Sequence, residues 1–448
     1  MKTTIGALLS LACLGLAACA TYAPRPLSPD ADAALRQPDL RAVARDAASL
    51  KHPRLKPLEI DLAKPLTPDE IALIAVIASP DLKAARAGAK VADAQVFQAG
   101  LLPDPSITLG FDKLLSGPDM FNGWTAQIAQ DLIAFRDRAV TLELQRSAAR
   151  QVRLDIAWQE WQAAGQARLI AARIVSLGKI AAIDETTRAS ADEMLQRVLA
   201  AAARGDVKAD EVETRRIAAA DAADKASSAA RDLDTARHEL NRLLGLKPDT
   251  EVAIAAPPPA LAPGDAEALF QRARAERLDL QALEAGYDSQ EAAVRKAVMD
   301  QFNSLQLTVT RVRDTANNQT LGGQVAFALP VWNRGRGGIA LAQATRDQLR
   351  AEYVARVFTA RADIADLVSQ LNLEAHARQV VLGQLVPLRR LADEMDAAAR
   401  RGDIALAVAQ AARQSVADKE MLLATLDQAI GEQTAALQIA VGGPLADD

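Results

Sequence analysis

Residues 79–88 read Ser-Pro-Asp-Leu-Lys-Ala-Ala-Arg-Ala-Gly, and residues 277–286 read Arg-Leu-Asp-Leu-Gln-Ala-Leu-Glu-Ala-Gly. Five of the ten aligned positions are identical, and the two stretches are offset by 198 residues. The sequence Arg-Gly-Asp-Val at 204–207 aligns in the same way with Arg-Gly-Asp-Ile at 401–404, at an offset of 197. Because two distant points keep nearly the same offset, the sequence predicts two copies of one structural unit.

Prolines mark the border between the two copies. The stretch 246–263 contains the consecutive prolines 257–259 and then Pro263. Such a run forbids helix and favours an extended backbone. We therefore predict a linker here, and a proline-rich ligand for a signalling domain is the alternative interpretation.

Each copy is expected to contain a helix, two strands, a very long helix and a further helix. The first helix should run from about residue 67 to residue 101. Thr67 is its expected cap, with Pro68 at the first helical position and Glu70 at the third. Pro80 lies inside this helix and predicts a kink.

Four segments alternate between apolar and polar residues with period two: 105–112, 124–131, 304–310 and 321–329. One face of each would be apolar, and the other would carry small and polar side chains. A half-buried sheet of a soluble protein has this pattern. A transmembrane barrel has it too, with apolar side chains toward lipid and polar ones toward the lumen.

The aromatic residues favour the membrane interpretation. The chain has only 15 of them, and seven lie in or beside the four strands. Aromatic side chains near strand ends are typical of a membrane-interface girdle, although strands also attract aromatics in soluble proteins. The seven are Phe111, Phe121, Trp124, Phe135, Phe302, Phe327 and Trp332.

Very long helices follow the strands. Residues 138–204 contain no proline, and as one helix they would span roughly 100 Å. The equivalent stretch of the second copy contains Pro387, which predicts a kink or a break. Heptad-like apolar spacing predicts packing against neighbouring helices, in a coiled-coil barrel or equally in a soluble bundle. The apolar positions are Ile170, Ile174, Leu177 and Ala181; Leu233, Ala236, Leu240 and Leu243; and Ile364, Leu367 and Leu371.

The N-terminus has the features of a targeting segment. Lys2 precedes an apolar run at 5–18, which is too short to span a bilayer. The run ends in Leu-Ala-Ala-Cys at 16–19, which resembles the lipobox of bacterial lipoproteins, so Cys19 is the predicted lipidation site. A plain signal peptide is the alternative. Ala20 would permit export to the outer membrane, and the single cysteine of the mature chain excludes an internal disulfide.

These features divide the chain into five predicted parts. They are a lipoprotein signal peptide at 1–18, a periplasmic N-terminal segment at 19–65, a first repeat at 66–245, the linker at 246–263 and a second repeat at 264–448.

Composition argues against several classes of protein. The net charge of −5 offers no basic surface for nucleic acid. The three histidines have no cysteine or histidine at metal-ligand spacing, so we expect no metal and no cofactor. The sequence contains no Gly-x-Ser-x-Gly, His-Glu-x-x-His or phosphate-loop motif. We therefore expect no catalytic residue and no enzyme.

Two tandem units of this kind resemble the TolC-type outer-membrane factor family. The stretches 79–82 and 277–280 resemble the family's Asn/Arg-Pro-x-Leu helix start, with Ser79 and Leu278 as departures. Ala-Leu-Pro-Val-Trp-Asn-Arg-Gly-Arg at 328–336 looks like its strand-to-helix motif. The resemblance covers roughly residues 60–445.

The resemblance implies a mostly α-helical chain with a transmembrane β-barrel. Each chain would contribute long coiled-coil helices to an α-barrel and four strands to a 12-stranded barrel closed by a homotrimer. Physical chemistry supports an oligomer independently, because four strands cannot close a barrel and open edges are not tolerated in lipid.

The implied function is a passive exit duct of a tripartite efflux system in the outer membrane. Its implied partners are a periplasmic adaptor protein and an inner-membrane pump of the RND type. The Gln-Asp-Leu at 130–132, Arg138 and the run 333–337 look somewhat like the heavy-metal-efflux branch, so metal cations or drugs are the expected cargo. The alternative is a helical scaffold lipoprotein without a pore.

The resemblance also implies site residues at the periplasmic end. Gly205 and Gly402 match the glycines at which the long helices reverse, since glycine permits the positive φ of a tight turn. Acidic residues after such turns narrow the family's pore, which makes Asp210 and Glu211 the candidate constriction. The alternative is that these carboxylates form a solvated face near a helix N-terminus, where negative charge is favourable.

Overall fold

The computed structural model describes residues 22–24, 27, 36–256 and 263–445. The chain divides into two compact units, Met1–Pro38 and Asp39–Asp448, and every element described below belongs to the second. The predicted signal peptide and Cys19 lie outside the described residues, as do residues 257–262 of the predicted linker.

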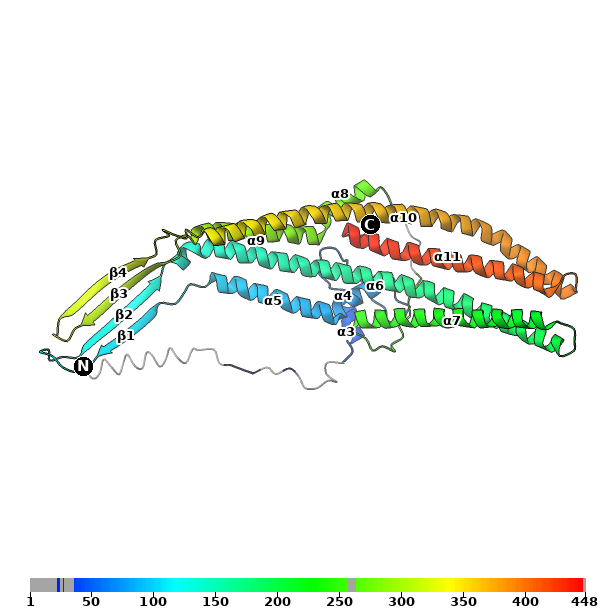
Figure 1. Ribbon diagram of the computed structural model, residues 1–448, viewed down its shortest axis with the longest axis horizontal. Helices are drawn as coiled ribbons and strands as arrows, with labels where there is room; N and C mark the ends of the chain where they lie inside the picture. The colour runs from blue at the N-terminus through cyan, green and yellow to red at the C-terminus, as the bar shows by residue number, and fades with distance from the viewer. Residues whose placement is uncertain (1–21, 25–26, 28–35, 257–262, 446–448) are drawn as a thin grey trace. The chain divides into compact units, whose positions relative to one another are not determined.

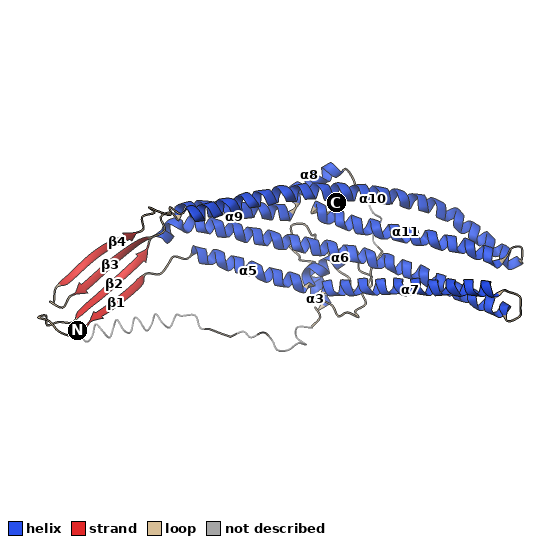
Figure 2. Cartoon of the chain, in the orientation of Figure 1, coloured by secondary structure: helices blue, strands red, loops and turns tan. Residues whose placement is uncertain are grey.

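The second unit contains two copies of the predicted order of elements (Figures 1 and 2). A short helix, α3 (Leu40–Ala47), precedes the copies. The first copy comprises α4 (Pro68–Ala78), α5 (Pro80–Gly100), β1 (Ser106–Asp112), β2 (Gly123–Asp131), α6 (Ile133–Ala202) and α7 (Ala209–Leu244). The second comprises α8 (Ala266–Glu276), α9 (Leu278–Met299), β3 (Leu305–Arg313), β4 (Gln319–Phe327), α10 (Arg336–Arg401) and α11 (Leu406–Val441).

The first predicted helix is two helices. Thr67 caps α4 through a capping box with Glu70, as the sequence predicts. The expected kink at Pro80 is instead a full break, because Ser79 adopts φ −50° and ψ 125° and Pro80 starts α5. Proline suits the first helical position, where its missing N–H costs nothing, and it forces the preceding residue out of the helical region.

Pro387, unlike Pro80, does not begin a new helix. Of the predicted kink or break, the break is wrong, since α10 runs through Pro387 to Arg401 as one helix. The residue four positions earlier, whose carbonyl a proline ring crowds, is Gly383.

All four strands form one antiparallel sheet in the order β1-β2-β3-β4. The central pair, β2 and β3, joins the two copies, with Ile128 opposite Val309. Strands β1 and β4 are therefore the edges of the sheet.

The helices in line with the edge strands form the two edges of the helical part of the unit. Helix α6 packs against α5 and α9 near the sheet and against α7 and α11 farther along, while α10 packs against α9 and α11. Among the described elements, α5 and α7 have no substantial contact with α10. The unit therefore has a first edge formed by β1, α5 and α7 and a second edge formed by β4 and α10.

The cores lie along the heptad seams that the sequence predicts. Ile170, Ala236 and Leu240 are buried in a cluster around α4 and the middle of α6, and Leu233 and Leu243 are partly buried beside it. A second cluster buries Ile364 and Leu371 of α10 against α8 and α11. Side-chain packing of this kind, rather than helix propensity, stabilises such long helices.

The N-terminal strap, residues 39–66, fastens both copies. His52 Nδ1 accepts the N–H groups of Arg54 and Leu55, at 3.0 and 3.1 Å. The other ring nitrogen therefore carries the proton and donates to the carbonyl of Ala157 in α6, at 3.0 Å. Arg54 donates to the carbonyl of Glu276 at the end of α8, at 2.6 Å. Burial lowers the pKa of His52 below its ordinary value.

Candidate functional site

The sheet has one apolar and one polar face. Directly paired residues of antiparallel strands lie on the same face of the sheet. The register therefore places every strand residue on one face or the other. Leu109 and Leu321 on the apolar face are 77% and 76% exposed. The apolar face carries Ile107, Leu109, Phe111, Trp124, Ala126, Ile128, Leu305, Leu307, Val309, Leu321, Val325 and Phe327, together with the polar Gln130, Arg311, Arg313 and Gln319. The polar face carries Ser106, Thr108, Asp112, Thr125, Gln127, Asp131, Gln306, Thr308, Thr310, Thr320 and Gln324, together with the apolar Ala129, Val312 and Ala326.

Neither face is covered within the described part of the chain. The strands contact one another extensively, and no described helix packs over them. In a soluble protein, the apolar face of such a sheet packs on the core. A large apolar surface that stays exposed marks a site of interaction with a partner or a membrane. The apolar face therefore requires an apolar environment from outside this chain.

The seven aromatic residues lie at the two ends of the sheet. Phe111, Phe121 and Trp124 are at the end away from the helices, and the other four are at or beside the end where the helices begin. From Leu305 to Arg313 the strand measures about 27 Å, close to the roughly 25 Å height of the apolar band on membrane barrels.

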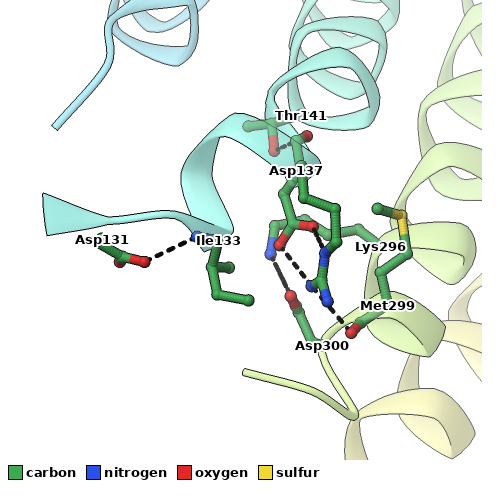
Figure 3. A network of polar contacts seen from close by, with 8 residues as sticks. Asp131, Ile133, Asp137, Thr141, Lys296, Met299 and Asp300 are labelled. Carbon is green, nitrogen blue, oxygen red and sulfur yellow. Dashed lines mark hydrogen bonds and ion pairs between the residues drawn. The ribbon is translucent and has the colours of Figure 1, made fainter. Parts of the chain in front are cut away.

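A polar network joins the sheet to the helices (Figure 3). Asp131, the last residue of β2, accepts the N–H of Ile133 at 2.8 Å and so caps the start of α6. Asp137 is buried and binds Arg136 at 2.6 Å, and Arg136 also donates to the carbonyl of Met299 at the end of α9. These contacts join the start of α6 in the first copy to the end of α9 in the second.

The long helices reverse at the predicted glycines. Gly205 and Gly402 both have φ +81°. At the first turn Gly205 donates to Ala202 and Asp206 donates to Ala201, and the second turn repeats this pattern. This is the Schellman motif, which places glycine in the left-handed region.

An arginine and an aspartate bracket each glycine. Arg204 binds Asp206 at 2.9 Å, and Arg401 binds Asp403 at 2.8 Å. The two turns therefore have the same backbone and the same ion pair.

The candidate constriction residues lie in the first turn of α7. Asp210 and Glu211 are exposed, and Asp210 accepts the N–H of Glu211 at 3.0 Å. No ion pair found in the described part of the chain includes either carboxylate. The aligned residues of the second copy are Ala407 and Val408, so these two carboxylates have no counterpart at the second turn.

Exposed apolar side chains lie along both edges of the unit. On the second edge, Val354 and Phe358 of α10 are 61% and 74% exposed. On the first edge, Phe97 of α5 is 71% exposed. These surfaces offer packing sites for further helices.

A buried ionic cluster connects the two copies, and sequence analysis did not find it. Arg277 binds Asp279 at 2.8 Å, donates to the carbonyl of Ala440 at 2.9 Å and lies 4.9 Å from the ring centre of Trp158. Asp279 also binds Arg356 of α10 at 3.2 Å. The Arg-Leu-Asp spacing was visible in the sequence, but its burial against α6 and α11 was not.

Asp155 of α6 lies beside this cluster. Its pKa is raised, chiefly because burial disfavours its charged form and also because the negative charge of Asp279 is near. The cluster therefore combines charged groups from both copies around α6.

Other potential sites are absent from the described residues. No group of three histidine, cysteine, aspartate or glutamate side chains among residues 22–24, 27, 36–256 and 263–445 could hold a metal ion. Separately, none of the helices that the structure describes is both long and apolar enough to cross a membrane.

No family model and no curated protein matches this sequence. Several solved structures, however, have a fold similar to that of this chain. The outer membrane protein VceC from Vibrio cholerae superposes with a TM-score of 0.67 at 17% identity, over 85% of this chain and 97% of VceC. The Campylobacter jejuni outer membrane channel CmeC gives a TM-score of 0.70 at 15% identity, over 85% of this chain and 87% of CmeC. This chain has the fold of an outer-membrane channel protein.

CusC, a further channel-forming protein, gives a TM-score of 0.66 at 15% identity, over 93% of this chain and 99% of CusC. The predicted fold of long helices with a four-stranded sheet is thereby confirmed, as is the resemblance to the TolC-type fold.

Proposed function

We propose that the chain is the subunit of a passive exit duct in the outer membrane. The observation that carries this proposal is the uncovered sheet, apolar on one face and polar on the other. In a bilayer the apolar face contacts lipid, and the polar face lines a water-filled lumen. The helices then extend into the periplasm, because they all leave the sheet from the same end.

The duct closes by joining copies edge to edge. An open sheet edge leaves backbone groups unsatisfied, which lipid does not tolerate. Pairing β1 of one copy with β4 of the next satisfies both edges. The same step brings α5 and α7 against the neighbour's α10, where the exposed Phe97 and Phe358 lie. Such a head-to-tail interface forms a ring when its rotation closes.

Three copies are the favoured number. Three times four strands gives a barrel of twelve. Two copies would give eight, whose interior is generally filled by side chains. The TolC-type resemblance also supports a homotrimer.

The same resemblance supports the remaining partners. They are a periplasmic adaptor at the turns around Gly205 and Gly402 and an inner-membrane pump of the RND type. Asp210 and Glu211 would narrow the lumen near these turns, and lipidation of Cys19 would anchor the chain. The pump, rather than the duct, would choose between metal cations and drugs.

Mass and conductance test the proposal. The purified protein should have close to three times the 47.6 kDa of one chain, and it should conduct ions across a planar bilayer. Phe358→Asp should weaken the assembly by placing a charge in the proposed seam, whereas Gln348→Ala on the same helix should not. A monodisperse monomer without conductance would instead support the non-pore scaffold.

A further inference from the structure

Two arginines interrupt the apolar face of the sheet at the end away from the helices. Arg311 and Arg313 alternate along β3 in step with Leu307 and Val309, so they share the apolar face. Neither guanidinium has a carboxylate partner among the residues that the structure describes. The register also places Gln130 and Gln319 on this face, and the two arginines are the only charged residues of the four described strands that lie on it.

Both arginines are held over aromatic rings. The guanidinium carbon of Arg311 lies 5.8 Å from the ring centre of Trp124, and that of Arg313 lies 5.5 Å from the ring centre of Phe121. At these distances a cation is attracted to the face of the ring, which favours the observed positions of the guanidinium groups. Two adjacent cations result.

Most of the arginine donors remain available. Arg311 donates one bond to the side-chain oxygen of Gln319, and Arg313 donates one to the carbonyl of Asn122, both at 3.2 Å. Nε of Arg313 is buried and has no partner. A guanidinium has five N–H donors, so two neutral acceptors leave most of them unused.

The acidic residues at this end are engaged elsewhere. Asp119 accepts the hydroxyl of Thr315, and Asp314 accepts the backbone and side-chain N–H groups of Asn318. Asp112 lies on the opposite, polar face. These three carboxylates therefore do not neutralise Arg311 or Arg313.

We propose that Arg311 and Arg313, with Trp124 and Phe121, bind the phosphate group of an anionic lipid in the leaflet away from the helices. The inference rests on the proposed function, because it needs the apolar face to be in a bilayer. An arginine on the lipid face is costly at mid-membrane and nearly free near the interface, where these two lie. Phosphate matches the forked guanidinium donors, and basic residues at this depth bind lipid headgroups. The acyl chains would lie along Val309 and Leu321.

Native mass spectrometry of the detergent-solubilised protein tests this site, with bisphosphorylated lipid A as the probe. Arg311→Gln and Arg313→Gln should each weaken binding about fivefold, and the double variant about 25-fold. Removing both phosphates from the probe should weaken wild-type binding equally. Arg390→Gln, a matched change on an exposed arginine of α10, should have no effect.

Unchanged affinity in the double variant, or equal affinity for the dephosphorylated lipid, would overturn the proposal. Full competition by millimolar inorganic phosphate would also overturn it, since the site would then bind free phosphate rather than lipid. Conductance in neutral phosphatidylcholine bilayers separates the two proposals. A double variant that conducts normally but keeps its lipid affinity contradicts the lipid site alone, whereas a wild type that neither assembles nor conducts contradicts the duct.

Discussion

The two copies of the repeat share a backbone but are fastened differently. In the first, the break between α4 and α5 begins with Pro80, and Gly245 at the end of α7 lies so close that an added Cβ would be 3.2 Å from the proline ring. In the second, Arg277 takes the place of Ser79, and an added Cβ on Gly442 would be 2.9 Å from the arginine side chain. Pro80 stabilises the break between α4 and α5, and the buried cluster of Arg277 and Asp279 stabilises the break between α8 and α9.

The two copies therefore share some structural features and differ in others. The helix ends and the turns depend on a few glycines and caps, which both copies retain. The residues around them differ, and the second copy has a cluster that packs against α6 of the first. The turn of the second copy has no counterparts of Asp210 and Glu211.

The largest expected effect tests the ionic cluster. Asp279→Ala should destabilise the protein by about 3–5 kcal/mol, because it leaves the buried charge of Arg277 without its partner. Asp81→Ala, at the aligned position of the first copy, should cost about 1 kcal/mol or less, since Asp81 is exposed in the first turn of α5. Denaturant titration of both variants measures the difference. Equal losses would mean that the two breaks are fastened alike.

The next effect should be equal in the two copies. Leu109 and Leu307 occupy aligned positions on the apolar face, so an arginine at either should cost about 2–4 kcal/mol in a bilayer. Gln306→Arg, on the polar face, should be much milder. Refolding yields in lipid vesicles at graded urea provide the comparison. A penalty at Gln306 as large as at Leu307 would reverse the assignment of the two faces.

The turn glycines should also behave alike. Gly205→Ala and Gly402→Ala should each cost about 1–2 kcal/mol, because alanine is strained at positive φ. Open space surrounds both α-carbons, so no steric clash adds to this cost. Thermal unfolding of the two variants should show similar shifts. A shift in only one of them would show that a neighbouring surface, and not φ alone, constrains that turn.

The N-terminal strap should add a pH dependence. The pKa of His52 is lowered in the folded state, so its contribution to stability is complete above the ordinary pKa near 6.5 and is lost as the pH falls below that value. Protonation would also remove the acceptor for Arg54 and Leu55. His52→Asn supplies an acceptor that does not titrate.

The variant should therefore lose less stability than the wild type between pH 7 and pH 5. Asp155, whose raised pKa acts in the opposite direction, is common to both proteins and cancels in their difference. Parallel pH profiles would contradict a role for His52.

The smallest effect concerns the acidic turn. If Asp210 and Glu211 narrow the lumen, Glu211→Ala should reduce the preference for cations and weaken the block of conductance by divalent cations. Val408→Ala, at the aligned position of the second turn, should change neither property. Unaltered selectivity in both Asp210→Ala and Glu211→Ala would leave these carboxylates as a solvated helix face.

Much of this architecture could be predicted because it depends on local chemistry. Period-two alternation identified all four strands, and the heptad spacing identified buried residues such as Ile170 and Ile364. The cap at Thr67 involves only Glu70, which is three positions later in the sequence. These features rest on neighbours in sequence, so the sequence by itself determined them.

Other features were decided only by the tertiary structure. Pro80 and Pro387 are the same residue type, yet one begins a helix and the other lies inside one, because their surroundings differ. Arg277 becomes buried only when α6 and α11 pack around it, and Arg311 meets Trp124 only when β2 pairs with β3. The sequence determined the repeat, the strands and the turns, whereas long-range packing decided which charges were buried, which were stacked and which edges stayed open.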